Sequence, residues 1–346
     1  MCVVAVTLLL LWALPRAKAL APAVPVVDLH ADLPYQVQFN GRSPSTGSGE
    51  YQARWLTAGG VVGAVMPLYV PKRVSSDGPQ MQHYEAAYSA FRQMLEQIPS
   101  YGGSVCRPMA NRVGTSPAFE GAEPLGDDPP SVRRWADRGV KLFGLVHSYD
   151  TRVAASSGRP STSPDFGLTE RGKRLVGAIH DAGGVVDVSH ASDAAVADIL
   201  TLARAAGRPV VATHSNSRLL APHPRNLTDA QARAIAATGG VIGVNFHSRF
   251  LLGTSKRATL DDVVRHVQHL LRIAGADHVA IGSDFEGGIR PPSALADVRG
   301  FPRLARALKD AGVDEKTLRK VFSRNALRVL CAPVVSKTPA VAPPGG

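Results

Sequence analysis

The amino-acid sequence predicts a single (β/α)8 barrel, and three observations support this fold class. Short runs rich in β-branched residues alternate with longer segments of helical period, which is the pattern of parallel strands joined by helices. Eight such runs spread over about 300 residues fit one barrel of ordinary size. No linker rich in Pro, Gly or Ser divides the chain into halves. An open doubly wound sheet is the alternative, but the absence of a GxGxxG motif after the first run argues against a dinucleotide site of that fold.

The strands are predicted from apolar runs that contain Val, Ile, Phe or Tyr and end in polar residues. In chain order they occupy residues 24–30, 61–70, 116–120, 140–147, 185–190, 209–215, 241–246 and 278–285. Because the carboxyl ends of barrel strands meet at one rim, the polar residues at these ends are the first place to look for a site.

The helices are predicted between and after these strands. They occupy residues 82–98, 131–138, 169–182, 192–206, 228–237, 260–274, 301–312 and 315–330. Ser192 and Thr228 stand at helix starts, where a side-chain oxygen can cap the first backbone N–H groups. Gly207 and Gly275 follow helix ends, where a left-handed backbone is common. Residues 39–58 and 71–81 have weak periodicity and are predicted to be loops over the barrel mouth.

The two ends of the chain differ from its body. Residues 3–14 form an apolar run, and the small-x-small sequence that ends at Ala19 resembles a signal-peptidase site. We therefore expect a signal peptide over 1–19 and an exported protein, whether periplasmic, secreted or membrane-associated. A misplaced start or a lone hydrophobic anchor is the alternative, and the protein would otherwise be cytoplasmic. A single catalytic domain is expected over 20–331, followed by a disordered tail over 332–346 that is rich in Pro, Ala and Gly.

Composition excludes several classes of protein. With 45% hydrophobic and 19% charged residues, the chain is neither disordered nor a transmembrane bundle. The formal charge of +11 comes from scattered basic residues with no run longer than a pair, which argues against a nucleic-acid partner. Cys2, Cys106 and Cys331 are far apart and form no CxxC motif, so we expect neither a disulfide framework nor a zinc-thiolate site.

Six of the eight predicted strands end in a group that can bind a metal or transfer a proton. These groups are Asp28, His30 and Asp32 after the first strand, Glu120 after the third, His147, His190 and His214 after the fourth to sixth, and Asp284 after the eighth. Around a barrel rim they would converge on one pocket, where burying so many ionisable groups without partners would be costly. Bound metal ions would balance that cost.

The types of ligand indicate which metal and how many ions. Imidazole and carboxylate groups without thiolates suit zinc or a similar divalent ion. A single catalytic zinc uses three protein ligands, and the available set is larger, so two ions are expected. A bridged metal pair activates water and polarises the carbonyl group of amides and esters. Asp28 could be a further ligand, although we favour a structural role as an acceptor of hydrogen bonds.

Eight segments resemble the signature blocks of the membrane (renal) dipeptidase family of zinc metallopeptidases, in the amidohydrolase-like barrel superfamily. Seven of them follow one another in the family's order, and the eighth closes the domain. The blocks are VVDLHADLP (26–34), FEGAEPLGDD (119–128), VVDVSHAS (185–192), THSNSR (213–218), PRNLTD (224–229), GGVIGVNF (239–246), DHVAIGSDFEG (277–287) and RNALRVL (324–330). The resemblance implies a TIM-like barrel of the metallo-dependent hydrolase type and a homodimer.

The resemblance also implies the role of each site residue. His30 and Asp32 would hold one zinc ion, His190 and His214 would hold the other, and Glu120 would bridge them. In the substrate pocket, Asp284 would bind the bridging water and pass its proton to the leaving amine. His147 would contact the substrate and stabilise the oxyanion, and Arg225 would hold the free C-terminal carboxylate of a dipeptide.

The sequence therefore predicts a zinc-dependent dipeptidase. Hydrolysis of another small amide, such as an acylated amino acid or a lactam, is the alternative, and a catalytically silent binding protein on the same fold is a third hypothesis. The remaining acidic and imidazole groups are expected to have structural or surface positions. They are Asp187 and His278 in strand segments, His223 in a loop, and His83, His180, His266 and His269 on helices.

Overall fold

In the computed structural model, which describes residues 24–74, 80–158 and 164–333, eight parallel strands form a closed barrel. The barrel strands are β1 (Val26–Asp28), β2 (Val61–Tyr69), β5 (Val113–Glu120), β6 (Leu142–Gly144), β7 (Val185–Asp187), β8 (Val210–Ala212), β9 (Val241–Val244) and β10 (Val279–Ile281). The ring closes because β1 pairs with both β2 and β10, and β2 also pairs with β5. The predicted fold class and all eight predicted strands are confirmed.

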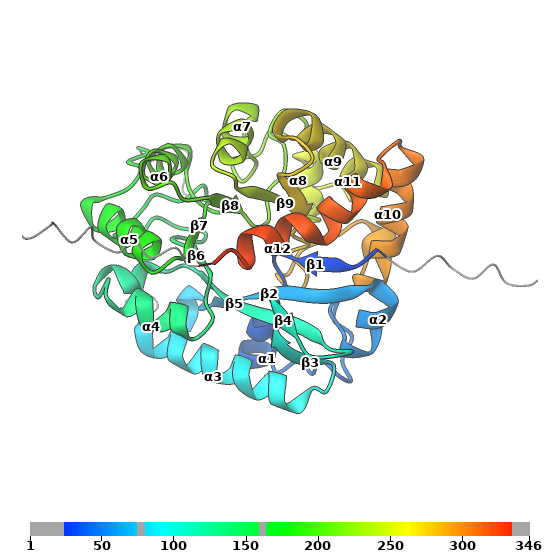
Figure 1. Ribbon diagram of the computed structural model, residues 1–346, viewed down its shortest axis with the longest axis horizontal. Helices are drawn as coiled ribbons and strands as arrows, with labels where there is room; N and C mark the ends of the chain where they lie inside the picture. Colours follow the sequence, from blue (N-terminus) through cyan, green and yellow to red (C-terminus); the bar gives the residue numbers. More distant parts are fainter. Residues whose placement is uncertain (1–23, 75–79, 159–163, 334–346) are drawn as a thin grey trace, which may run out of the picture.

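The helices surround the barrel (Figure 1). They are α1 (Leu33–Asn40), α2 (Leu56–Gly59), α3 (Met81–Gln97), α4 (Ser131–Asp137), α5 (Glu170–Asp181), α6 (Asp193–Ala206), α7 (Asp229–Ala237), α8 (Ser248–Leu252), α9 (Leu260–Ala274), α10 (Phe301–Asp310), α11 (Glu315–Arg319) and α12 (Asn325–Leu330). The hydroxyls of Ser192 and Thr228 cap α6 and α7, as predicted. The last predicted helix is present but is divided by a π-helical turn, Lys320–Arg324, between α11 and α12.

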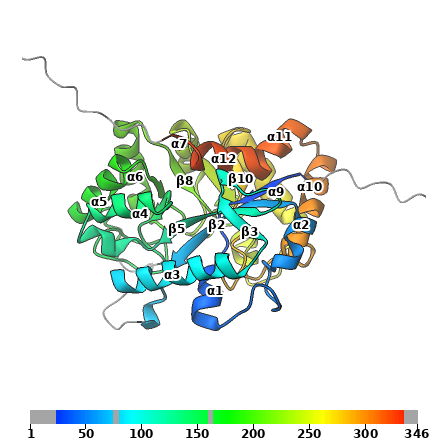
Figure 2. The same cartoon turned by 60° about the horizontal axis from the view of Figure 1, so that its bottom comes forward.

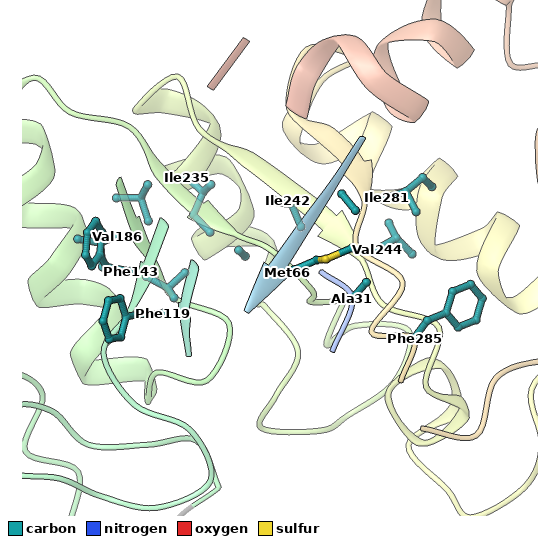
Figure 3. Packing of buried hydrophobic residues seen from close by; sticks show 14 of the residues in the cluster. Ala31, Met66, Phe119, Phe143, Val186, Ile235, Ile242, Val244, Ile281 and Phe285 are labelled. Carbon is teal, nitrogen blue, oxygen red and sulfur yellow. The ribbon is translucent and has the colours of Figure 1, made fainter. Parts of the chain in front are cut away.

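Alternate residues of each strand enter two separate apolar cores. Phe119, Phe143 and Val186, on the neighbouring strands β5, β6 and β7, face outward into the layer between barrel and helices (Figure 3). There the ring of Phe119 meets that of Trp135 from α4 edge-to-face at 4.9 Å. The residues one position away on the strands, such as Ala118 and Val185, belong to the core inside the barrel.

Helix α12 closes the amino-terminal end of the barrel. Its residues Ala326, Val329 and Leu330 belong to the inner core, together with Val105. The side-chain amide of Asn325 donates to the backbone oxygens of Ala276 and Val279, which fixes the helix beside β10. Figure 2 shows α12 and α1, the helix after β1, at opposite ends of the barrel. The carboxyl ends of the strands, the first of which leads into α1, therefore lie at the end of the barrel opposite α12.

The structure corrects three expectations. Residues 39–58 are not a continuous loop, because they contain the end of α1, a 3-10 turn at Ala53–Trp55 and most of α2. A short hairpin of β3 (Tyr101–Ser104) and β4 (Arg107–Pro108) beside β5 was not predicted. Cys106, in the turn of this hairpin, forms a disulfide with Cys331 at the end of α12. The expectation of no disulfide was wrong, because 225 residues of sequence separate two cysteines that the closed barrel brings together.

The predicted signal peptide at 1–19 and all but two residues of the predicted tail at 332–346 lie outside the described residues. None of the helices in the described part of the chain has the length and apolar character needed to cross a membrane.

Candidate metal centre

The candidate site forms where the inward-facing positions of the strands become polar at the carboxyl ends. Side chains repeat every two residues along a strand, so Ala118 in the inner core is followed on the same face by Glu120. In the same way the inner-core residue Val185 precedes Asp187, and Val211 precedes Thr213. The barrel interior therefore ends in a polar layer directly below the mouth.

One carboxylate oxygen lies at the centre of four imidazole groups. Oε1 of Glu120 is 3.0 Å from Nε2 of His190, 3.4 Å from Nε2 of His30, 3.6 Å from Nε2 of His214 and 3.8 Å from Nε2 of His147. Glu120 is 6% exposed, so water cannot solvate its charge fully. The structure thus brings together four predicted residues from four strand ends around Glu120.

Asp32 and Asp284 complete the cluster on the side of His30. Nε2 of His30 is 3.5 Å from Oδ2 of Asp32. Three groups of residues have ligand atoms within 4.8 Å of one another, and together they contain all seven predicted strand-end groups other than Asp28. These groups are His30 with Glu120 and His214, Glu120 with His147 and His190, and His30 with Asp32 and Asp284. Because they share members, they form one continuous cluster.

The donor atoms of this cluster fit divalent metal ions. Nε2 of His190 is 3.0 Å from Nε2 of His214, and both atoms face the Glu120 carboxylate. Nε2 of His30 is buried and forms no hydrogen bond within the described residues. Lone pairs that converge on one point without a proton between them repel, whereas a cation among them is attracted to every one. All the ligands are nitrogen or oxygen atoms, as zinc-type sites use.

The protonation states also suit a cation. Burial, with the nearby charge of Arg225, lowers the pKa of His190 well below its usual range. Burial and the imidazole of His30 have the same effect on the pKa of His214. Burial alone would raise the pKa of Glu120, but the facing imidazoles of His30 and His147 hold it well below its usual range. His190 and His214 are therefore neutral and Glu120 is ionised, which are the forms that bind metal.

His30 differs from the other two buried imidazoles. Burial alone would lower its pKa, but the carboxylates of Glu120 and Asp32 outweigh burial and raise the pKa well above the usual value. The two carboxylates therefore demand a positive charge at this point of the cluster. Either a proton on His30 or a bound cation can supply it, so metal binding here would displace that proton.

Asp284 is held in an unusual backbone conformation at the edge of the cluster. Its φ of 65° lies in the left-handed region, which few non-glycine residues occupy. The side-chain amide of Asn245 donates to Oδ2 of Asp284 at 2.8 Å. A Cβ atom at Gly287 would lie 2.5 Å from Oδ1 of Asp284 and 2.6 Å from Oδ2 of Asp32, so only glycine leaves room for both carboxylates. Burial, followed by the charge of Asp32, raises the pKa of Asp284 to about 7.

Arg225 places a buried positive charge in the lining of the same pocket. It is 7% exposed, and its Nη2 lies 3.3 Å from Nε2 of His190. Its Nε and Nη1 atoms have no hydrogen-bond partner within the described residues. Burial lowers the pKa of Arg225 to about 10, so the group keeps its proton at neutral pH. The N–H groups on these two unpartnered nitrogens of a buried cation are suited to an anionic ligand.

These walls enclose a pocket of about 390 Å³. Tyr35 and Tyr69 line it on the side of α1 and β2, and the ring of Tyr69 packs against His147 at 4.4 Å. Phe250 and Ile289 also line it, and the guanidinium of Arg225 lies 5.4 Å from the centre of the Phe250 ring. The pocket therefore has a carboxylate-rich floor, one cationic corner and aromatic walls.

Four of the residues expected to be structural lie outside the three ligand groups. Asp28 accepts hydrogen bonds from the backbone and hydroxyl of Ser283 and from the backbone of His30, and it does not belong to any of the three ligand groups. His180, His266 and His269 are buried on helices away from the cluster. Asn245 and Thr213 contact site residues but were not singled out from the sequence, because polar residues are common near strand ends and only the barrel register shows which of them face inward.

Comparisons with known proteins agree with this geometry. A family model described as membrane dipeptidase, peptidase family M19, matches residues 14–339. An uncharacterised Klebsiella pneumoniae protein from the pqqA 5′ region is 41% identical over 220 residues, which cover 61% of this chain and 79% of the relative. The dipeptidase ataJ of Aspergillus terreus is 29% identical over 92% of this chain and 86% of its own length.

A solved structure shows the same architecture with a bound ligand. It is a metallo peptidase from Rhodobacter sphaeroides, liganded with a phosphinate mimic of the dipeptide L-Ala-D-Ala. It is 28% identical to this chain and superposes with a TM-score of 0.78 over 89% of this chain and 99% of its own. Since the family model spans nearly the whole sequence and the cluster carries the ligands of a metal centre, the chain belongs to peptidase family M19, the membrane dipeptidase family of metallopeptidases.

Proposed function

We propose that this protein is a dipeptidase that hydrolyses dipeptides with a free C-terminal carboxylate and uses two zinc ions per chain. One observation carries the proposal. A buried cluster of imidazoles and carboxylates suited to metal ions shares a small pocket with the unpartnered N–H groups of Arg225. The pocket thus combines a centre that can activate an amide with a cation that can hold a carboxylate.

The cluster offers ligands for two ions. His30 and Asp32 would hold one ion, His190 and His214 the other, and Glu120 would bridge them, because each pair is in contact and Glu120 faces both. When bound, the ions would supply an activated water and polarise the carbonyl group of the scissile bond.

The other residues of the pocket bind the substrate and move its protons. Arg225 would pair with the C-terminal carboxylate of the dipeptide and so set the position of the peptide bond over the cluster. His147 would donate a hydrogen bond from Nε2 to the carbonyl oxygen in the tautomer in which its Nδ1 accepts from the hydroxyl of Ser148, 2.8 Å away. Asp284 would accept a proton from the attacking water and deliver it to the leaving amine. A carboxyl with a pKa of about 7 can both accept and donate a proton at neutral pH.

The relatives support this substrate class. The Rhodobacter sphaeroides metallo peptidase was solved with a phosphinate mimic of a dipeptide, and the Aspergillus terreus relative is named as a dipeptidase. Hydrolysis of acylated amino acids or lactams would use the same centre but would not always need a cation for a free carboxylate.

The test combines metal analysis with a comparison of two substrates. Purified protein should contain two zinc ions per chain and release amino acids from a panel of L,L and L,D dipeptides. Arg225→Gln should lower kcat/KM for a dipeptide by about 100-fold, as expected for loss of a buried bidentate pair. The same change should have little effect on the C-terminal amide of that dipeptide.

Arg233→Gln is the matched control, because Arg233 is exposed on α7 and should leave both substrates unaffected. The proposal fails if no dipeptide is cleaved with or without added zinc. Equal effects of Arg225→Gln on the acid and the amide would instead favour an amide substrate without a free carboxylate.

We also propose that the protein is exported and that it forms a homodimer. The disulfide between Cys106 and Cys331 supports export, because such bonds persist in oxidising compartments. Cell fractionation of the full-length chain, with N-terminal sequencing of the product, tests the export and the cleavage after Ala19. Size-exclusion chromatography with light scattering tests the dimer.

A further inference from the structure

The hydroxyl of Thr213 lies between two of the predicted metal ligands. Its Oγ1 is 2.9 Å from Nδ1 of His214 and 3.3 Å from Nδ1 of His30. In the proposed function these two histidines belong to different metal ions. Thr213 is 1% exposed, and it occupies the inward position of the polar layer that separates the apolar barrel interior from the ligand cluster.

The direction of each hydrogen bond at this hydroxyl follows from the donors available. Oγ1 of Thr213 is 2.5 Å from Oδ2 of Asp187, and a carboxylate can only accept, so the threonine proton points to Asp187. The hydroxyl has no second proton, so it can only accept from the two imidazoles. His30 and His214 must therefore both carry a proton on Nδ1. In their neutral forms each then has a bare Nε2 that faces Glu120.

Asp187 is fixed in turn by neighbours that each donate a hydrogen bond to its carboxylate. Its Oδ1 accepts from the backbone N–H of Thr213 at 3.0 Å, and from the backbone and hydroxyl of Ser189 at 3.0 and 2.7 Å. The Ser189 hydroxyl also accepts from the backbone of His214 at 3.1 Å. The Ser189 hydroxyl also lies 3.1 Å from Oγ1 of Thr213. Both hydroxyls lie closer to the Asp187 carboxylate, at 2.7 Å for Ser189 and 2.5 Å for Thr213, so both protons are directed to Asp187.

The backbone of Thr213 is held equally closely. A Cβ atom at Gly243 of β9 would lie 2.0 Å from the backbone oxygen of Thr213, and one at Gly282, directly after β10, would lie 1.7 Å from it. Two glycines thus allow three neighbouring chain segments to approach at this point. The position of the Thr213 backbone, and with it that of the hydroxyl, is therefore set by the packing of the barrel strands.

We propose that Thr213 is a positioning residue that fixes the tautomer and ring orientation of one ligand in each of the two metal sites, with Asp187 as the acceptor that orients it. This inference rests on the proposed function for the assignment of His30 and His214 to different ions. It predicts that one hydroxyl couples the two sites, so that its loss weakens both together. Removal of such an outer hydrogen-bond partner typically lowers metal affinity 10–100-fold.

The experiment measures metal binding as well as activity. Thr213→Val keeps the shape of the side chain but replaces its hydroxyl with a methyl group. We expect both zinc dissociation constants, measured by competition with a chromophoric chelator, to rise about 10–100-fold. The visible absorption of the protein loaded with Co²⁺ should also change, because both ligand rings can now rotate. Thr213→Ser should restore affinity and spectrum to within about 3-fold of the wild type, since it restores the hydroxyl.

Thr115→Val is the matched control. It makes the same change at a buried threonine of β5. Thr115 precedes Glu120 by five residues along that strand, about 17 Å from the mouth. If Thr213→Val does not fold, as judged by circular dichroism, Asp187→Asn carries the test, because it removes the acceptor that orients the hydroxyl.

The outcomes separate this inference from the proposed function. A wild-type protein that binds no zinc would overturn the proposed function itself. A wild type with two zinc ions and a Thr213→Val protein with unchanged dissociation constants and an unchanged Co²⁺ spectrum would overturn only the role of Thr213. Weakening of a single metal site would overturn the coupling of the two sites through one hydroxyl.

Discussion

Asp284 combines a strained backbone with a raised pKa, and in the proposed function it is the residue that moves a proton. Its φ of 65° and its hydrogen bond from Asn245 fix the carboxylate beside Asp32, and such strain is common where geometry must be held for chemistry. An Asn at this position has the same size and tolerates the same backbone conformation. Its side-chain amide, however, cannot take up and release a proton as the carboxylate can. We expect Asp284→Asn to lower kcat by about 10²–10⁴-fold, with the zinc content unchanged.

Steady-state kinetics together with metal analysis test this prediction. Asp277→Asn is the control, because Asp277 is an exposed carboxylate that pairs with Lys320 away from the pocket. A large loss of zinc in Asp284→Asn would show instead that Asp284 is a metal ligand, a role its closeness to His30 and Asp32 also allows.

His266 on α9 shows how a buried imidazole can make stability depend on pH. Its Nδ1 accepts from the backbone N–H of Ser217 and its Nε2 donates to the backbone oxygen of Leu251, so only the neutral ring satisfies both partners. Burial lowers the pKa of His266 to about 4. In the unfolded chain it returns to about 6.5, so between these values the unfolded state binds more protons. The contribution of His266 to the free energy of unfolding is therefore complete above pH 6.5 and is lost as the pH falls toward 4.

We therefore expect the wild-type protein to lose about 2–3 kcal/mol of unfolding free energy from this residue between pH 7.5 and 4.5. His266→Gln should be less stable than the wild type at pH 7.5, yet it should lose correspondingly less stability on acidification. Urea unfolding at several pH values measures both effects. Parallel stability curves for the two proteins would show that His266 does not contribute to the acid sensitivity.

The segment between α1 and α2 is fastened to the site by one buried carboxylate. Glu286, with a φ of 68°, is 1% exposed. Its carboxylate accepts from the backbone of Tyr51 at 2.9 Å and from Nη1 of Arg42 at 3.0 Å, and its backbone N–H donates to Glu50 at 2.8 Å. The next three residues, 287–289, line the pocket. Glu286 therefore links the backbone of Asp284 to a segment that begins more than 230 residues earlier.

Loss of this carboxylate should loosen the segment and the pocket edge together. We expect Glu286→Gln to lower the unfolding free energy by about 2–3 kcal/mol, because hydrogen bonds to a buried charge are lost, and to speed tryptic cleavage after Arg42. Glu315→Gln, at an exposed position of α11, is the control. Unchanged proteolysis in Glu286→Gln would show that the segment is held by its other contacts.

The elements that the sequence predicted well are those with a strong local signal. The strands are β-branched runs, and α6 and α7 start at capping hydroxyls. Helix α1 was missed because LPYQVQFN has no apolar stripe of helical period, so its helix depends on contacts with α3 and β2. The hairpin of β3 and β4 is short and contains two glycines, which are poor strand formers.

The same distinction applies to the site. The metal-ligand candidates could be predicted because His and carboxylate residues at several strand ends form a pattern along the chain. Thr213, Asn245 and Gly287 could not, because nothing in their local sequence shows that they face the cluster. Their roles depend on the register between strands, on hydrogen bonds across the barrel and on the room that two carboxylates need.

On the scale of the whole molecule, the disulfide and the metal centre lie at opposite ends of the barrel. Cys106 and Cys331 join the hairpin of β3 and β4 to α12, which closes the amino-terminal end, whereas the ligands stand at the carboxyl ends of the strands. Linking residues that are 225 apart removes many conformations of the unfolded chain, so the bond should stabilise the fold by about 2–4 kcal/mol. It should have no direct effect on chemistry.

We therefore expect the double change Cys106→Ser with Cys331→Ser to lower the Tm, because the unfolded chain gains freedom while the pocket keeps all its contacts. The kcat/KM for a dipeptide at 25 °C should stay within about 2-fold of the wild type, since each tenfold change needs 1.4 kcal/mol at the transition state. Thermal unfolding with and without a reducing agent measures the effect, and the reductant should lower the Tm of the wild type alone. If the reductant leaves the wild type unchanged, the two thiols are not joined in solution. If the double variant loses activity at 25 °C, a change in the packing of α12 alters the metal centre through the inner core. The two ends of the barrel would then not be independent.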